Sequence, residues 1–306
     1  MGFFGRKRAP SVPHPRKEPR FDGPLTLERL EQIFQDCVDF TKRPVSLGEG
    51  GACTLTLCYL SGMVKMERVS DYVLRPLAQD EALARCGTPR QAMEEMMGGA
   101  LYNLSAAERT TLDEAAFDLV AGWCLLFFPG ESAVLSLFVG TEEKRSISSP
   151  SNETVLKGSK DAFVESLRTN TSIVRRHLKA PELRIQEQIV GRQSATLVDL
   201  LYIEGITNPH LVEQVAAQLR DIDIDGVFST GAIEEYIVPA ERTPFPLIQY
   251  TERSDRFCAG LAQGRVGILI DGIPLGYLAP AVLGNFLQAP QDKSSNWLLA
   301  TVLTVL

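Results

Sequence analysis

The chain has 306 residues, of which 44% are hydrophobic and 23% are charged, and its formal net charge is −7. This balance is typical of a soluble globular protein that is long enough for two domains. Residues 1–20 hold six basic residues and one acidic residue, so the rest of the chain is more acidic than the whole. An acidic body lacks the basic surface that nucleic acids require, and we therefore expect no nucleic-acid partner.

Residues 1–21 form a basic, proline-rich tail that we expect to be disordered. The alternative is that its charge contacts anionic lipid on a cytoplasmic membrane face. Phe3 and Phe4 do not make the apolar core of a signal peptide, so we expect no secretion signal. The six cysteines form no CxxC pair and lie mostly in apolar runs, which favours reduced thiols packed in a cytosolic protein core.

The first predicted subdomain spans residues 22–150 and mixes helical periodicity with short apolar runs. Its predicted elements are a helix over 25–40, a strand over 54–60, helices over 66–77, 89–97 and 106–120, and strands over 123–128 and 133–139. The last two strands flank Pro129-Gly130, which predicts a hairpin.

Residues 151–181 are predicted to form a helical linker between two lobes. Ser159 can cap a helix that runs to about Lys179 and ends before Pro181. The second predicted subdomain follows at residues 182–296.

The second subdomain repeats features of the first. Leu57–Gly62 aligns with Leu200–Gly205 at an offset of 143, and Gly122–Gly130 aligns with Gly264–Gly272 at an offset of 142. Chance similarity between apolar strands that end in glycine is the alternative. The predicted fold class is α/β, with two similar mixed-sheet α/β subdomains joined by a helical linker.

Residues 297–306 are strongly apolar. Ten helical residues reach about 15 Å, whereas a bilayer core is about 30 Å thick. The segment is therefore too short to span a membrane as it stands. It is either the start of a truncated transmembrane helix or a C-terminal core element.

Motifs for catalysis or metal binding are scarce. The three histidines, His14, His177 and His210, stand apart from any metal-binding or nucleophile motif. Gly48–Gly51 is not followed by the lysine and helix of a nucleotide-binding loop. Asp221–Gly226 resembles the start of a calcium loop but lacks its closing glutamate, so an edge strand with a turn is the alternative. We therefore expect no enzyme activity, no metal and no cofactor.

Two polar clusters are the candidate sites for a ligand or for contact between the lobes. The first cluster holds Arg168, Asn170, Arg175 and Arg176. The second cluster holds Thr251, Glu252, Arg253, Asp255 and Arg265. If the lobes face each other across the linker, these residues could bind an anion or form ion pairs between the lobes.

Several runs in the correct order resemble the GerA family of spore germination proteins, specifically the A subunit of the nutrient germinant receptor. The resembling runs include Lys144–Ile147, Glu165–Asn170, Arg175-Arg176, Val190–Arg192, Leu201–Ile206 with Asn208-Pro209, Ile222–Gly226, Pro244–Pro246, Gln249–Arg253 with Asp255, Gly264–Val266 and Asp271-Gly272. The resemblance is strong over about 144–290 and weaker over 53–80.

This resemblance implies a cytoplasmic N-terminal region of two α/β subdomains that is followed by a membrane domain in the inner spore membrane. It implies B and C subunits as partners, a homo-oligomer formed through the membrane domain, and coupling of nutrient sensing to ion release. It also favours the start of a membrane helix at 297–306. The alternative from the residues alone is a small-ligand binding module with its site in the cleft between two lobes.

Overall fold

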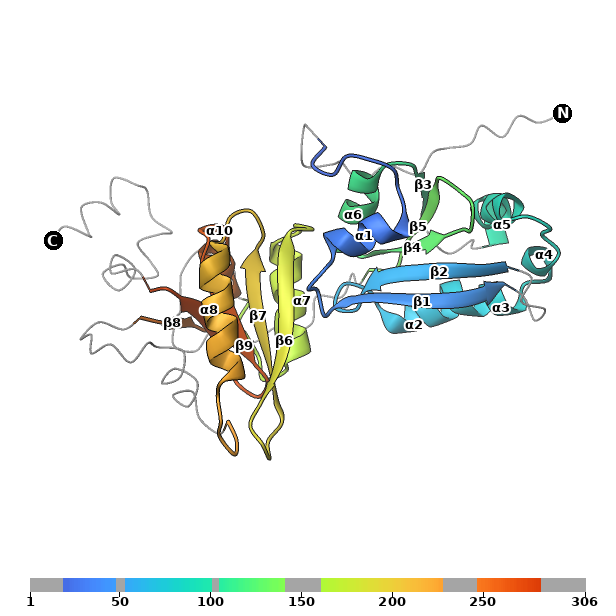
Figure 1. The fold of residues 1–306 in the computed structure, drawn as a ribbon. Helices are drawn as coiled ribbons and strands as arrows, with labels where there is room; N and C mark the ends of the chain where they lie inside the picture. Colours follow the sequence, from blue (N-terminus) through green and yellow to red (C-terminus); the bar gives the residue numbers. More distant parts are fainter. Residues whose placement is uncertain (1–18, 48–52, 101–104, 141–160, 228–246, 282–306) are drawn as a thin grey trace. The chain divides into compact units, whose positions relative to one another are not determined.

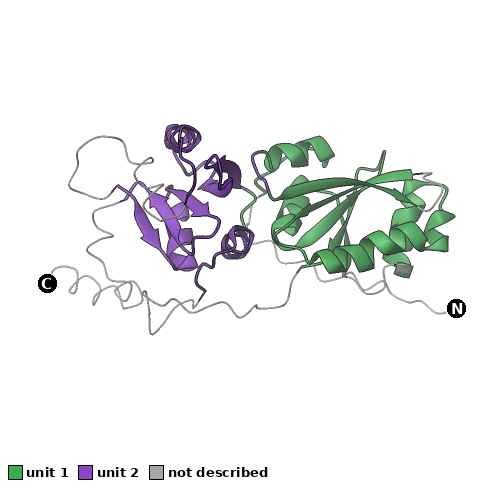
Figure 2. Cartoon of the chain, turned by 90° about the horizontal axis from the view of Figure 1, so that it is seen from below, with its two compact units in different colours: residues 1–35, 39–143, 179–181 green, residues 36–38, 144–178, 182–306 purple. Residues whose placement is uncertain are grey.

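The computed structural model describes residues 19–47, 53–100, 105–140, 161–227 and 247–281 (Figure 1). These residues fall into two compact units, which Figure 2 colours separately. Unit 1 comprises residues 1–35, 39–143 and 179–181, and unit 2 comprises residues 36–38, 144–178 and 182–306.

Unit 1 holds a five-stranded sheet in the order β1-β2-β4-β5-β3. Every pairing between its named strands is antiparallel. The elements are α1 (Leu27–Ile33), β1 (Phe40–Leu47), β2 (Cys53–Leu60), α2 (Met66–Val69), the π-helix η1 (Ser70–Leu74), α3 (Arg75–Gln79), α4 (Glu81–Ala84), α5 (Pro89–Glu95), the π-helix η2 (Met96–Ala100), β3 (Ala106–Arg109), α6 (Leu112–Val120), β4 (Trp123–Phe127) and β5 (Val134–Phe138).

Unit 2 holds a second five-stranded antiparallel sheet in the order β6-β7-β9-β10-β8. The elements are α7 (Leu167–His177), β6 (Leu183–Val190), β7 (Thr196–Ile203), α8 (Pro209–Arg220), β8 (Gln249–Thr251), α10 (Ser254–Ala262), β9 (Val266–Ile270) and β10 (Gly276–Ala279).

The two units are copies of one design. The first, second, fourth, fifth and third strands of each copy lie in the same order across the sheet. β1 and β2 coincide with β6 and β7 at an offset of 143 residues, and α6 coincides with α10 at an offset of 142. Gly122 and Gly264 share a positive φ (89° and 85°), as do Gly130 and Gly272 (77° and 82°). The prediction of two similar α/β subdomains is confirmed, and the sheets are antiparallel rather than mixed.

The helix predicted within the linker is α7, and the structure places it inside unit 2. α7 packs on α10 as α1 packs on α6, so α7 is the first helix of the second copy. Asp271, which follows β9, accepts a hydrogen bond from the backbone N–H of Leu167 at 3.0 Å. The Thr171 hydroxyl donates to the buried Asp199 of β7 at 2.9 Å. These side chains fix α7 to the sheet of its own unit.

The sheet of unit 2 is covered on both faces. Leu200 packs with Val212 and Val215 of α8, whereas its neighbour Leu201 packs with α7 and α10. The alternation of side chains along β7 explains this division, because successive residues of a strand point to opposite faces. Strands buried on two faces show continuous apolar runs, and such runs made β7 and β9 recognisable in the sequence.

Several local predictions need correction. Residues 106–109 form β3 instead of the start of a helix, because they pair with β5. The helix predicted over 25–40 ends at Ile33, and the strand β1 was missed. Ser166, not Ser159, caps the helix that precedes Pro181, and Ser159 lies outside the described residues.

The segment that resembles a calcium loop has a packing role. The backbone carbonyl of Asp225 accepts hydrogen bonds from Gln193 and Ser194, and Asp223 forms an ion pair with Arg192 at 2.6 Å. These contacts hold the β6–β7 turn. Across the described ranges, no group of three or more His, Cys, Asp or Glu side chains is placed to hold a metal ion.

Two predicted terminal segments lie mostly or wholly outside the described residues. Residues 20 and 21, assigned to the tail, are described, and both backbone N–H groups donate to Asp113 of unit 1 at 3.0 and 3.3 Å. The predicted membrane-helix start at 297–306 is not described. Within the described part of the chain, no helix has the length and apolar character needed to cross a bilayer.

We expect the buried thiols to be inert in the folded chain. Burial raises the pKa of Cys58, Cys124 and Cys258 to about 12. Their thiolates form readily only after unfolding, where a thiol has a pKa of about 8.5. Pulse alkylation at about pH 8, read by mass spectrometry, should therefore label the partly exposed Cys53 and Cys86 first.

The raised pKa values of these three thiols also make the stability of the fold depend on pH. The unfolded chain releases these protons at a lower pH than the folded chain, so stability should fall as pH rises from about 9 towards 12. Equal labelling rates for all these thiols under native conditions would contradict the burial.

Candidate functional site

A short segment of unit 2, residues 161–165, crosses the junction between β8 and α10, and we call it the strap. Ala162 forms an isolated antiparallel bridge with Arg253. The N–H of Phe163 donates to the carbonyl of Glu252 at 2.8 Å, and the N–H of Ser254 donates to the carbonyl of Asp161 at 3.3 Å. The strap thus extends the sheet edge beside the second predicted cluster.

Asn170, a member of the first cluster, holds the strap from the other side. Its side-chain amide donates to the carbonyl of Val164 at 2.6 Å, and its side-chain oxygen accepts from the N–H of Val164 at 2.8 Å. Asn170 is fully buried on α7. A buried amide with both ends satisfied specifies one position for the backbone that it binds. Asn170 therefore fixes where the strap leaves α7.

The charged turn of the second cluster is the β8–α10 junction. The hydroxyl of Thr251 accepts from the N–H of Arg253 at 3.1 Å. The Arg253 guanidinium pairs with both carboxylate oxygens of Asp255, at 3.1 and 2.6 Å. Arg253 is buried and Asp255 is partly exposed. The residue of unit 1 that corresponds to Asp255 is Asp113, in the first turn of α6.

The other predicted site residues on α7 lie apart from the strap. Arg168 is half exposed and pairs with Glu187 of β6. Arg175 is fully buried, whereas Arg176 is exposed. The structure therefore brings Asn170 and the residues Thr251 to Asp255 together through the strap, within unit 2. The role of the nine residues in a contact between lobes stays a prediction.

Sequence reasoning missed a serine and a histidine that meet Asp161, the first residue of the strap. His177 Nε2 lies 3.2 Å from the Ser254 hydroxyl and 3.5 Å from Asp161 Oδ2. A hydrolase triad needs the serine and the carboxylate on different ring nitrogens. Here both approach Nε2, and Ser254 is fully buried while it donates to the carbonyl of Asp161. The contacts among Asp161, His177 and Ser254 therefore attach the strap to α7 and α10, and their geometry is not that of a catalytic triad.

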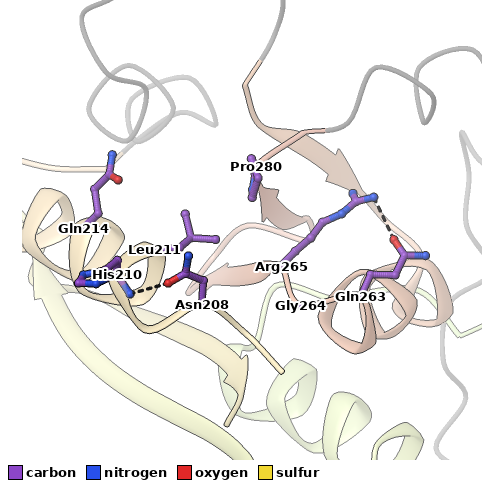
Figure 3. Close-up of a pocket in the computed structure, with 8 residues that line it drawn as sticks. All are labelled: Asn208, His210, Leu211, Gln214, Gln263, Gly264, Arg265 and Pro280. Atoms are coloured by element: carbon purple, nitrogen blue, oxygen red, sulfur yellow. Dashed lines mark hydrogen bonds between the residues drawn. The ribbon is translucent and has the colours of Figure 1, made fainter. Parts of the chain in front are cut away.

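A pocket of about 560 Å³ lies at one end of unit 2, where α8 begins and β9 begins (Figure 3). Residues that line it are Asn208, His210, Leu211, Gln214, Gln263, Gly264, Arg265 and Pro280. Arg265 is 7% exposed and donates to Gln249 Oε1 at 2.9 Å and to Gln263 Oε1 at 3.0 Å. Burial, and then the positive charge of Arg256, lower the pKa of Arg265. Of the nine predicted site residues, only Arg265 lines this pocket.

Comparison with known proteins agrees with the resemblance that the motifs suggested. The family model described as "Bacillus/Clostridium GerA spore germination protein" matches residues 28–306. The solved N-terminal domain of the A subunit of the Bacillus megaterium spore germinant receptor GerK3 matches with a TM-score of 0.68 and 28% sequence identity. That match covers 86% of this chain and 99% of the solved domain.

Curated relatives are longer than this chain. The uncharacterized membrane protein YfkQ of Bacillus subtilis is 32% identical over 277 residues, which make up 90% of this chain and 53% of YfkQ. Spore germination protein KA of the same organism is 32% identical, over 88% of this chain and 48% of that protein. The chain therefore spans about half the length of the curated relatives that it matches.

Proposed function

The chain belongs to the Bacillus/Clostridium GerA spore germination protein family, and we propose that it is the N-terminal region of the A subunit of a nutrient germinant receptor. The observation that carries this proposal is the extent of one structural match. The solved N-terminal domain of the GerK3 A subunit is covered over 99% of its length, at 28% identity. The match covers 86% of this chain, which is more than either of its two units alone.

We further propose that this region lies on the cytoplasmic side of the inner spore membrane. A membrane domain outside this chain would form the homo-oligomer and join the B and C subunits. Support comes from the relatives, since the matched part is about half of each and one of them is named a membrane protein. In this proposal the region is not an enzyme, and it couples nutrient sensing to ion release.

Unit 2 offers an element suited to such coupling. The strap is held at both ends by directional polar contacts, to Asn170 on α7 and to Glu252 and Ser254 at the β8–α10 junction. Buried hydrogen bonds of this kind are made or broken together, because a half-satisfied network is costly. An element with two discrete arrangements is what a switch requires. We propose that the strap is the part of unit 2 whose position reports receptor engagement.

The test is made in spores that carry the full-length receptor subunit. Arg253→Ala removes the partner of Asp255 beneath the strap, and Arg168→Ala removes the exposed pair with Glu187. We expect the Arg253 variant to slow the nutrient-triggered loss of optical density several-fold, and the Arg168 variant to slow it less. The matched control is Arg192→Ala, because Arg192 also pairs with a carboxylate but is 69% exposed.

Immunoblots of the spore membrane fraction separate a signalling defect from a loss of protein. A normal nutrient response in the Arg168 and Arg253 variants, at normal protein levels, would contradict the signalling role proposed for these residues. A normal response in spores that lack the whole subunit would instead remove the proposed receptor function.

A further inference from the structure

We propose that residues 20–22 form a releasable latch on unit 1, and that an anionic lipid surface opens this latch when it binds the basic residues that precede it. The latch is the counterpart, in the first copy, of the strap in unit 2. Its test needs only this chain and lipid vesicles, so the proposal does not rest on the receptor role proposed above.

The latch and the strap occupy equivalent places in the two units. The strap precedes α7 and crosses the junction that leads into α10, whereas the latch precedes α1 and reaches the first turn of α6. α1 packs on α6 (Figure 1), as α7 packs on α10. Phe21 lies six residues before the start of α1, and Asp161 lies six residues before the start of α7. Each unit thus ties the segment before its first helix to the beginning of a later helix.

The contacts that hold the two segments differ in kind. The strap is held by backbone hydrogen bonds to the β8–α10 junction and by a buried amide. The latch is held by charged side chains. The backbone N–H groups of Arg20 and Phe21 donate to Asp113 Oδ1 at 3.0 and 3.3 Å. From α1, Arg29 Nη2 donates to the backbone carbonyl of Asp22 at 3.1 Å.

Arg29 reaches over the latch because residue 23 is a glycine. Gly23 has a φ of 112°, which glycine adopts without strain, and a Cβ atom added there would overlap Nη2 of Arg29. Arg29 and Asp22 are both exposed, so their contact contributes little to the stability of the fold. The latch can therefore open while α1 and α6 stay folded.

The charge of the chain changes sign at the latch. Residues 1–20 hold six basic residues and one acidic residue, whereas residues 21–143 hold 19 acidic and nine basic residues. An anionic surface therefore attracts the segment before the latch and repels the unit that follows it. Each basic residue close to such a surface raises the binding constant roughly five-fold. Six of them together can outweigh the few hydrogen bonds of the latch.

The arrangement of the basic residues favours a lipid surface over other anions. They are spread over residues 6–20, and a surface can contact all of them at once, whereas free phosphate contacts them one at a time. Phe3 and Phe4 add two aromatic rings, which suit the interface of a bilayer. A nucleic acid offers the same phosphates without an apolar layer for these rings.

Latch release and lipid binding must be coupled in both directions. A surface opens the latch only if it binds the open form more tightly, so a variant that loosens the latch must bind the surface more tightly. This reciprocity gives the test its sign. Arg29→Met loosens the latch and removes one positive charge. The loss of charge alone would weaken binding to anionic vesicles, whereas release of the latch strengthens it.

The experiment mixes the 306-residue chain with vesicles of phosphatidylglycerol and phosphatidylcholine, or of phosphatidylcholine alone. Amide hydrogen exchange is read by mass spectrometry with residue resolution. We expect the anionic vesicles to bind and to speed exchange at the N–H of Phe21 at least about ten-fold. Exchange at the N–H of Phe163 in the strap should stay unchanged. Phosphatidylcholine vesicles and inorganic phosphate should change neither.

Two exposed variants test the coupling. Arg29→Met and Gly23→Ala should each bind the anionic vesicles about three- to ten-fold more tightly than the parent chain. Gly23→Ala leaves the charge unchanged, so its effect isolates the release of the latch. The matched controls are Arg85→Met, which removes a positive charge from an exposed ion pair, and Gly87→Ala, whose added Cβ would make no close contact. Neither control should tighten binding.

The basic residues before the latch are tested separately. Arg16→Gln/Lys17→Gln should weaken binding of the anionic vesicles roughly 25-fold. Vesicle binding without faster exchange at Phe21 would overturn the proposal, and so would Arg29→Met binding no more tightly than Arg85→Met. Opening by inorganic phosphate, by phosphatidylcholine vesicles, or by a DNA duplex without opening by anionic vesicles would overturn it too. Absence of binding to the anionic vesicles would do the same.

Discussion

Replacing Asp118 with alanine should destabilise unit 1 by about 3–5 kcal/mol. Asp118 is 1% exposed and accepts from Arg109 at 2.7 and 3.2 Å and from the Ser136 hydroxyl at 2.7 Å. Arg109 is itself buried and lies over the ring of Trp123, 5.9 Å from its centroid. Removing the carboxylate leaves a buried guanidinium without its ionic partner, which is among the largest effects of a single substitution.

Unit 2 shows that the fold does not need this ion pair. The equivalents of Arg109, Asp118 and Ser136 in unit 2 are Thr251, Gly260 and Leu278. A Cβ atom at Gly260 would lie 2.5 Å from Leu278 Cδ1, so the leucine fills the space that the polar group occupies in unit 1. The same backbone therefore accepts an apolar solution at this position.

The double variant Arg109→Met/Asp118→Leu should thus recover most of the loss, because well-packed apolar groups often replace a buried ion pair without cost. Urea denaturation followed by far-UV circular dichroism measures the change, and peptide-level hydrogen exchange assigns it to unit 1. Glu81→Ala serves as the control, since its pair with Arg85 is 77–83% exposed and should contribute at most about 0.5 kcal/mol. A loss below about 1 kcal/mol for Asp118→Ala would contradict the argument.

The duplication was visible in the sequence in two kinds of place, the apolar strands Leu57–Leu60 and Leu200–Ile203 and the turns where backbone geometry constrains the residue type. Gly122, Gly130, Gly264 and Gly272 have φ between 77° and 89°, a region that glycine occupies without strain. These glycines and the apolar runs between them show the repeat at an offset of 142. The helices α1 and α7 occupy equivalent places but read LERLEQI and LRTNTSIVRRH, which share no pattern beyond a leucine. The equivalence of α1 and α7 lies in what they pack against, which the sequence does not state.

Only part of the candidate site could be predicted, because some of its contacts are visible in residue type and others are not. Charged residues close together, such as Arg253 and Asp255, are easy to notice, and they do form a pair. The strap was missed because its contacts are mostly backbone hydrogen bonds, which leave no pattern in residue type. Arg265 was noticed, but its pocket depends on Pro280, a residue that only the register of β9 and β10 brings opposite it.

The aromatic pair that joins the strap to α10 should show strong energetic coupling with a glycine of the sheet. Phe257 is fully buried, and its ring meets Phe163 of the strap edge-on at 5.3 Å. A Cβ atom added at Gly276 would lie 2.5 Å from Phe257 and 2.7 Å from Phe163. Phe257→Ala should cost about 3–5 kcal/mol because it leaves a cavity. Gly276→Ala should cost about 1–3 kcal/mol because neither ring has room to move.

The double variant Phe257→Ala/Gly276→Ala should be less destabilised than the sum of the two, by at least about 1 kcal/mol, because the new methyl group enters space that the ring has vacated. The control pairs Phe257→Ala with Gly87→Ala of unit 1, whose added Cβ would meet only Gln91 at 3.7 Å. Those two effects should add within about 0.5 kcal/mol. Urea unfolding gives the free energies, and hydrogen exchange at Phe163 and Val164 reports whether the strap has loosened. Additivity in the first pair would mean that the rings do not depend on the missing side chain of Gly276, and the strap would then be held by its hydrogen bonds alone.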